Sequence, residues 1–180
     1  KRRFEMNETE IRGPGVYKSE AGRELVENEY RRILDSFSGV PHRSEFARTI
    51  AGKTHVLRFD DAAGDRPRAG SADRAAGRSR PPVLMLHGSM SNSATWFGCA
   101  GDFMDMFSLY CVDIPGEPGL SEPVRLPLAS EKPAEWLRSL LDDLGIEKCA
   151  IVGMSLGSWY ALRFASAYPE RVSALSLITT

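Results

Sequence analysis

Apolar residues along this chain fall into short uninterrupted runs and into longer stretches with helical spacing. The short runs predict buried strands at residues 81–86, 109–112, 149–152 and 172–178. The stretches with helical spacing lie between and after the first three strands, at residues 94–107, 133–144 and 156–168. Strands and helices therefore alternate as a doubly wound, mostly parallel α/β sheet requires.

Two further strands and one helix are predicted before this alternation begins. Residues 45–50 and 54–59 predict an opening hairpin with Gly52 in its turn. Upstream of it, residues 19–37 predict an amphipathic helix with Ser19 as the N-cap, and residues 60–82 predict a loop. We therefore divide the chain into an N-terminal extension over residues 1–42 and an α/β core over residues 43–180.

The motif with the most chemical content is Gly153-Met154-Ser155-Leu156-Gly157, which joins a predicted strand to a predicted helix. A serine in this context matches a nucleophile elbow, where flanking glycines leave room for a strained backbone. Attack by Ser155 on a carbonyl would create an oxyanion, and the amide of Leu156 is one expected donor to it. Taken alone, the motif also fits an ordinary strand-to-helix turn.

Two upstream segments give the motif its context. His87-Gly88-Ser89 directly follows the strand at 81–86, and Asp113 to Ser121 follows the strand at 109–112 with the spacing Asp-x-x-Gly. In this order, the three segments resemble the α/β-hydrolase superfamily, in particular its serine esterases and lipases. The resemblance runs from about Phe46 to Thr180. One departure is that Glu117-Pro118 stands where the family more often has His-Gly, with one extra residue before Gly119.

The resemblance assigns roles to individual residues. It implies that the amide of Ser89 is the second oxyanion donor, beside that of Leu156. It also implies that the residues shaping the elbow and the loop before it are Gly153, Gly157, His87 and Gly88. The segment from Asp113 to Ser121 is expected to shape the pocket without taking part in catalysis.

The acid and the histidine base of the family are missing from the expected place. The family order is serine, then acid, then histidine, yet residues 156–180 contain no histidine and no aspartate. Glu170 is a carboxylate, but a helix starting at Ser155 rises about 1.5 Å per residue and carries the chain roughly 20 Å from the elbow. Glu170 is therefore expected at the opposite edge of the sheet.

Three explanations remain for the missing base. The first is that the chain is the N-terminal portion of a longer serine hydrolase for esters, thioesters or amides, truncated after the sixth strand. The second is a catalytically inactive, hydrolase-like binding or interaction protein. The third, which we disfavour, is an active enzyme with His87 as an unusual base. In each case the strand at 172–178 would be an apolar sheet edge, so we expect a missing C-terminal segment or a second chain to cover it.

Charge and composition exclude several classes of function. With 23 basic and 24 acidic residues, the formal charge of -1 gives no general attraction to nucleic acid. The arginines of loop 60–82 are diluted by aspartates and lack interleaved aromatic residues. Acidic residues offset the arginines of helix 19–37, so we expect no membrane binding. A small-molecule acyl substrate is the expected partner.

The cysteines and histidines bear on the cellular location of the protein and on whether it binds a metal or a cofactor. The cysteines are odd in number and lie in predicted helices or strands, which predicts reduced thiols and a cytoplasmic protein; they are Cys99, Cys111 and Cys149. No cluster of cysteine and histidine has metal-ligand spacing, and we assign His42 to a loop and His55 to a strand. Glycine-rich phosphate loops are also missing from the sequence, so we expect neither a metal nor a cofactor.

Overall fold

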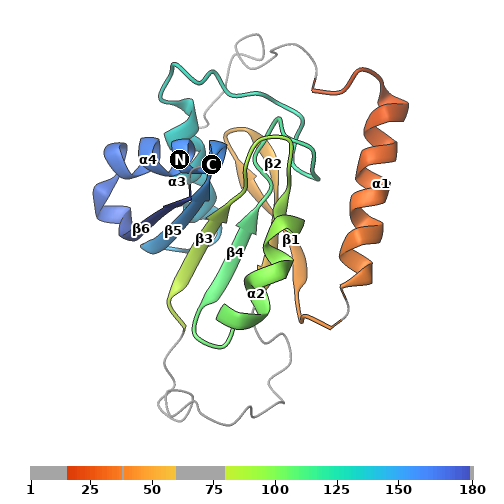
Figure 1. Cartoon of the computed structure of the whole chain (residues 1–180). Helices are drawn as coiled ribbons and strands as arrows, with labels where there is room; N and C mark the ends of the chain where they lie inside the picture. Colours follow the sequence, from red (N-terminus) through yellow and green to blue (C-terminus); the bar gives the residue numbers. More distant parts are fainter. Residues whose placement is uncertain (1–15, 38, 60–79, 179–180) are drawn as a thin grey trace.

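The computed structural model describes residues 16–37, 39–59 and 80–178. A sheet with the strand order β1-β2-β4-β3-β5-β6 forms its centre (Figure 1). Its strands are β1 (Arg43–Thr49), β2 (Gly52–Phe59), β3 (Pro82–Leu86), β4 (Ser108–Val112), β5 (Cys149–Met154) and β6 (Val172–Ile178). The α-helices are α1 (Glu20–Ser36), α2 (Phe97–Phe103), α3 (Lys132–Asp143) and α4 (Leu156–Ala167). Two short 3-10 helices, η3 (Ser93–Trp96) and η4 (Pro169–Arg171), complete the described elements.

Strand directions confirm the predicted doubly wound, mostly parallel sheet. The hairpin strands β1 and β2 are antiparallel, and β2 is also antiparallel to β4. From β4 onward, every pairing through β3 and β5 to β6 is parallel. The carboxyl ends of β3, β4 and β5 therefore meet at one edge of the sheet, where open α/β folds place their sites.

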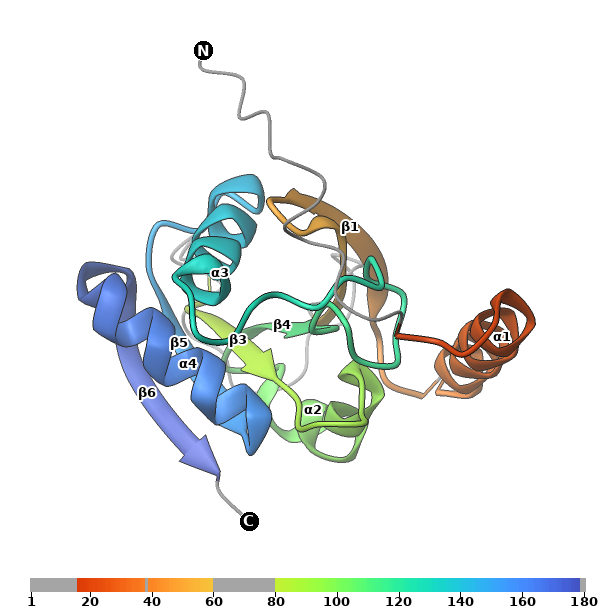
Figure 2. The same ribbon diagram turned by 90° about the horizontal axis from the view of Figure 1, so that it is seen from above.

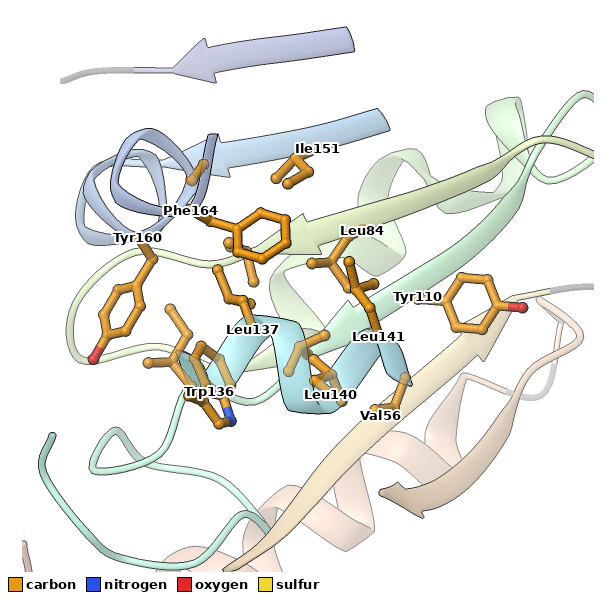
Figure 3. Close-up of a cluster of buried hydrophobic side chains, with 14 of the residues drawn as sticks. Val56, Leu84, Tyr110, Trp136, Leu137, Leu140, Leu141, Ile151, Tyr160 and Phe164 are labelled. Carbon is orange, nitrogen blue, oxygen red and sulfur yellow. The ribbon is translucent and has the colours of Figure 1, made fainter. Parts of the chain in front are cut away.

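Helices cover both faces of the sheet, and Figure 2 shows α3 and α4 on the face opposite α2. Side chains alternate along β3, so that Leu84 and Leu86 join the cluster under α3 and α4, whereas Val83 and Met85 join the cluster under α2 and α1. Figure 3 shows the first cluster, where α3 contributes Trp136, Leu137, Leu140 and Leu141, all fully buried. These two cores fix the parallel strands, and with them the sheet edge formed by the carboxyl ends of β3, β4 and β5.

Helix α1 packs on the second face through one side only. Tyr30 and Leu34 are buried in the cluster that also contains Trp96 and Phe97, while Leu25 is exposed on the outer side. The predicted N-cap is confirmed, since Ser19 Oγ accepts the amide N–H of Gly22 at 3.0 Å. The domain boundary that we place at residue 42 stays a prediction.

The main difference from the sequence prediction concerns residues 94–107. One helix was predicted there, but the structure has η3 followed by the short α2, and residues 104–107 form a turn before β4. Asn92 caps η3 by accepting the amide of Ala94, and Gly98 and Gly101 weaken the helix that follows. Strand ends elsewhere differ by one or two residues, and the hairpin turn lies at Ile50–Ala51 with Thr49 opposite Gly52.

Parts of two predicted segments lie outside the described residues, namely 1–15 of the N-terminal extension and 60–79 of the predicted loop. Thr179 and Thr180 lie outside them as well. Among the residues that are described, no helix has the combined length and apolar character needed to cross a membrane.

Candidate active site

Ser155 is the single residue between the end of β5 and the start of α4, and its backbone conformation is strained. Its φ of 49° and ψ of -112° lie outside the regions that residues with a side chain ordinarily occupy. Such strain persists only where the surroundings impose it, and it is concentrated at functional sites. The serine is also exposed, in contrast to the buried Gly153 and Gly157 that flank its turn.

Close backbone packing explains both glycines of the motif. A Cβ atom on Gly153 would lie 2.6 Å from the carbonyl oxygen of Gly157, and one on Gly157 would lie 2.2 Å from the carbonyl oxygen of Leu86. Neither position has room for a methyl group, because each contact is to backbone. Helix α4 therefore lies directly against the end of β3, and its N-terminus follows directly after Ser155.

Two hydrogen bonds fasten the turn to the neighbouring strand. The amide of Ser155 donates to the carbonyl of Ile178 at 2.8 Å, at the end of β6. The buried Ser158 donates its hydroxyl to the carbonyl of Gly153 at 2.7 Å, and Ile178 O lies 3.2 Å from the same Oγ. The backbone of the turn is thus held from both β5 and β6.

The loop after β3 lies against the candidate nucleophile. A Cβ atom on Gly88 would be 3.6 Å from Ser155 Cβ, so the loop passes close to the serine side chain. The amide of the next residue, Ser89, follows within this loop, and Leu156 is the first residue of α4 on the other side of Ser155. The two residues that the sequence predicts for an oxyanion hole therefore lie in the two segments next to Ser155, and their role stays a prediction.

His87 is buried beneath this loop. Within the described residues, its ring forms hydrogen bonds only with backbone groups. Its Nδ1 lies 2.7 Å from the carbonyl oxygen of Gly88, and its Nε2 accepts the amide of Ile114 at 3.0 Å. With both ring nitrogens occupied in this way, the ring ties the loop after β3 to the loop after β4. It has no ring nitrogen left for Ser155.

His87 should make the stability of the fold depend on pH. Burial lowers the pKa of this ring, so the folded protein keeps it neutral, whereas the unfolded chain protonates it below about pH 6.5. The unfolded state then binds more protons, and the free energy of unfolding falls as the pH falls. We expect His87→Gln to flatten this loss between about pH 7 and about pH 5, as measured by urea denaturation. A slope equal to that of the wild type would contradict this assignment.

Glu117 reaches the other end of the loop. Its Oε2 accepts the amide of Met90 at 2.6 Å, and Met90 has a positive φ of 57° with its side chain largely exposed. Glu117 is one of the two residues that stand where the family more often has a His-Gly pair. The departure thus supplies a carboxylate that holds the peptide next to Ser89.

Asp113 is the hydrogen-bonding centre of the loops behind the site. This buried carboxylate accepts the hydroxyl of Tyr30 at 3.0 Å, ring nitrogen Nδ1 of His55 at 2.8 Å, and the amides of Ser93 and Leu120 at 2.8 and 2.9 Å. Burial by itself would raise the pKa of Asp113, but the hydrogen bonds, with that of His55 foremost, hold the pKa below its ordinary value. The carboxylate therefore stays ionised at neutral pH.

The sequence interpretation of Asp113 and His55 missed their contact. Both residues were assigned to structure, and the signal that would have paired them is the hairpin register, which places His55 on the strand beside β4. Tyr30 is 83 residues away from Asp113 along the chain, and no local sequence pattern predicts that contact.

None of the hydrogen bonds made by the chain's three histidines reaches Ser155. His42 Nδ1 lies 2.7 Å from the carbonyl of Val40, and His87 has the backbone partners given above. The ring of His55 bonds Asp113 through Nδ1 and Ser44 Oγ through Nε2. The described residues also hold no group of three or more histidine, cysteine or acidic side chains suited to a metal ion. The turn at Ser155 thus forms without a hydrogen-bonded histidine from the described part of the chain.

A mostly parallel sheet with a strained serine between strand and helix, at the edge where the parallel strands end, defines an α/β protein with a nucleophile-elbow architecture. Residues 81–180 match the family described as alpha/beta hydrolase fold. The chain belongs to this family, and the resemblance found in its sequence motifs is confirmed.

Similar proteins include several carboxylesterases of Bacillus subtilis. The chain is 30% identical over 152 residues to the uncharacterized carboxylesterase nap, covering 83% of this chain and 45% of that protein. It is also 30% identical over 153 residues to carboxylesterase YbfK, covering 83% and 46%. The crystal structure of naproxen esterase (carboxylesterase NP) aligns with a TM-score of 0.67 at 28% identity, over 88% of this chain and 50% of that one. The chain spans about half the length of these relatives.

Proposed function

We propose that the protein carrying this chain is a serine hydrolase that cleaves an ester, thioester or amide through an acyl-enzyme on Ser155. The observation that carries the proposal is the strained, exposed Ser155 with the Gly88 loop close to its side chain. Similarity to carboxylesterases favours an ester among the three substrate classes. The fold alone would not decide the chemistry, because this scaffold also supports other reactions.

The proposed mechanism divides the work between backbone and side chains. Ser155 Oγ attacks the substrate carbonyl, and the amides of Ser89 and Leu156 stabilise the negative charge that develops on its oxygen. The bond from the carbonyl carbon to the alcohol, thiol or amine then breaks, and this leaving group takes up the serine proton. Water then hydrolyses the acyl-enzyme and restores the Ser155 hydroxyl. The base that takes the serine proton, and the acid that orients it, would come from a segment beyond these 180 residues. The engagement of His42, His55 and His87 with other partners supports this division.

Labelling of the full-length protein with a fluorophosphonate tests the proposal. We expect the probe to form a covalent adduct on Ser155, identified by peptide mass spectrometry, and Ser155→Ala to lose that adduct together with ester hydrolysis. Ser166→Ala, at an exposed position near the end of the same helix, is the matched control and should keep both. A folded full-length protein with no adduct on Ser155 would instead favour the alternative, a catalytically inactive hydrolase-like binding protein.

Glu117 provides a second test, directed at the oxyanion loop. We expect Glu117→Ala to lower kcat by roughly 10- to 100-fold with a smaller change in KM, because the peptide next to Ser89 loses its carboxylate anchor. Glu117→Gln keeps an acceptor and should recover most of the rate. Glu147→Ala changes an exposed carboxylate and serves as the control. Hydrolysis of a p-nitrophenyl ester measures all three, and equal kcat values for the wild type and Glu117→Ala would refute the role.

We further propose that β6 is covered in the complete protein by a following segment or by a second chain. Within the described residues β6 is paired on one side only, by β5, and its apolar side chains Leu175, Leu177 and Ile178 are each more than a third exposed. A paired neighbour would remove the edge and shield these side chains. The cytoplasmic location also stays a proposal, supported by the free thiols of Cys99, Cys111 and Cys149.

A further inference from the structure

A second serine, far from the elbow in sequence, forms the end of a hydrogen-bonded series of side chains. Ser44 Oγ on β1 lies 2.9 Å from His55 Nε2 on β2. His55 Nδ1 lies 2.8 Å from Asp113 Oδ2 at the end of β4. Serine, imidazole and carboxylate thus follow one another in the order that activates a nucleophile, with each of the two ring nitrogens facing the required partner.

The surroundings determine where the protons lie in this series. Asp113 is an ionised acceptor, so Nδ1 of His55 carries the proton that points at it. In the neutral ring Nε2 then presents a lone pair, and the Ser44 hydroxyl donates to it. Because Tyr30 donates its own proton to the other carboxylate oxygen, Asp113 is held in place from a second side. The imidazole is therefore oriented as a general base toward Ser44.

The series is buried at one end and open at the other. His55 and Asp113 are almost completely inaccessible, whereas Ser44 is an exposed residue of a strand that has a neighbouring strand on one side only among the described residues. The ring of Phe46, 43% exposed, lies 5.2 Å from the His55 ring between centroids. Lys53 Nζ lies 3.8 Å above the centre of Phe46. An aromatic surface and a cation thus flank the approach to Ser44.

Strand geometry supplies an oxyanion donor. The amide of Arg48 points away from β2, since it donates to Asp143 on α3 at 3.0 Å. Amide directions alternate along a strand, so the amide of Ser44, four residues earlier, points to the same outer edge. This resembles the arrangement in which the amide of a nucleophilic serine contributes to its own oxyanion site.

We propose that Ser44, His55 and Asp113 form a second reactive site, which accepts the acyl group of a small activated ester with an aromatic leaving group. Ser44 Oγ forms a bond to the carbonyl carbon, and the serine proton passes to His55 Nε2. The bond from that carbon to the aryl oxygen then breaks, and the departing phenolate takes the proton from His55. Acyl-Ser44 and a phenol result, with Phe46 contacting the aromatic ring and Lys53 stabilising the phenolate as it leaves.

The test uses the full-length protein with Ser155→Ala, so that the elbow contributes no adduct. A fluorophosphonate reacts by the same first step, forming a bond from Ser44 Oγ to phosphorus as fluoride leaves. We expect peptide mass spectrometry to locate the adduct on Ser44, formed about 10²-fold or more faster than on the exposed Ser36, whose hydroxyl donates only to the backbone carbonyl of Ile33. Adding Ser44→Ala should remove the adduct and leave the thermal melting curve unchanged.

A His55→Asn variant tests whether Ser44 reacts because His55 acts as its base or only because Ser44 is exposed. With Ser155 retained, this variant should lose the Ser44 adduct while a cooperative thermal melt shows that it is folded. Equal labelling of Ser44 with and without His55 would overturn the proposal. If the variant does not fold, the comparison of Ser44 with Ser36 still decides, since equal rates at these two serines also overturn it. The proposal does not rest on Ser155, and its outcome is read independently of the adduct at the elbow.

Discussion

The Gly157→Ala variant should be strongly destabilised, because the added methyl group has no free space. Its Cβ would lie 2.2 Å from the carbonyl oxygen of Leu86 and 2.7 Å from that of His87. Leu86 cannot retreat, since it pairs with Val112 on β4 and with Gly153 on β5. We expect a loss of about 3 kcal/mol or more, at the upper end of what overpacking costs, against a total stability of roughly 5–15 kcal/mol.

Urea denaturation of the full-length protein measures this loss, and Gly98→Ala provides a matched control. Gly98 is an exposed residue of α2 with nothing within 4 Å of an added Cβ. Alanine there should stabilise the helix by about 0.5–1 kcal/mol. The two glycine-to-alanine changes should therefore shift the midpoint in opposite directions. A stabilised Gly157→Ala variant would show that α4 does not pack against β3 in this way.

Asp113→Ala should be the most damaging change to a polar side chain. It leaves four donors without their acceptor, namely Tyr30, His55 and the amides of Ser93 and Leu120. Leaving a buried polar group without its partner costs about 1–3 kcal/mol, and with four donors affected we expect a total loss of about 3–5 kcal/mol. Because Tyr30 is the polar anchor of α1, the same variant should also expose that helix to protease.

Two measurements check this expectation. Urea denaturation should show the large loss for Asp113→Ala, while Asp102→Ala, at an exposed position of α2, should stay within about 0.5 kcal/mol of the wild type. Limited proteolysis should cut within α1 faster in the first variant than in the second. Equal cleavage rates would mean that the hydrophobic contacts of Tyr30 and Leu34 hold α1 without help from Asp113.

The sequence determined the parallel strands well, because each is a short apolar run bounded by residues that end strands. The run from Val83 to Leu86 alternates between two cores and is buried on both faces, which is the pattern of a central strand. The helix at 94–107 was predicted too long, since apolar spacing alone does not register the cap at Asn92 or the effect of Gly98 and Gly101.

The candidate site was predictable where the chemistry is local. Strand, glycine, serine and helix follow one another within a few residues, so Ser155 and its neighbouring amides were found, although the nucleophilic role of Ser155 remains a prediction. Contacts between distant segments were not found. Tyr30, His55 and Asp113 meet only after α1, β2 and β4 have packed, and burial of a polar group far along the chain leaves no periodic signal in the sequence. Glu117 was noted as a departure, but its bond to Met90 required the folded loop.

The hydrogen bond from the Ser155 amide to Ile178 O makes hydrogen exchange at this amide depend on the edge strand of the sheet. Hydrogen exchange at that amide requires the end of β6 to detach, an event far smaller than global unfolding. Fraying of one strand end would remove this one restraint on the serine backbone while the contacts of the turn with β5 and both hydrophobic cores remain intact. Whatever binds that strand should therefore slow exchange at the Ser155 amide, so protection of this one amide would report on the occupancy of the sheet edge.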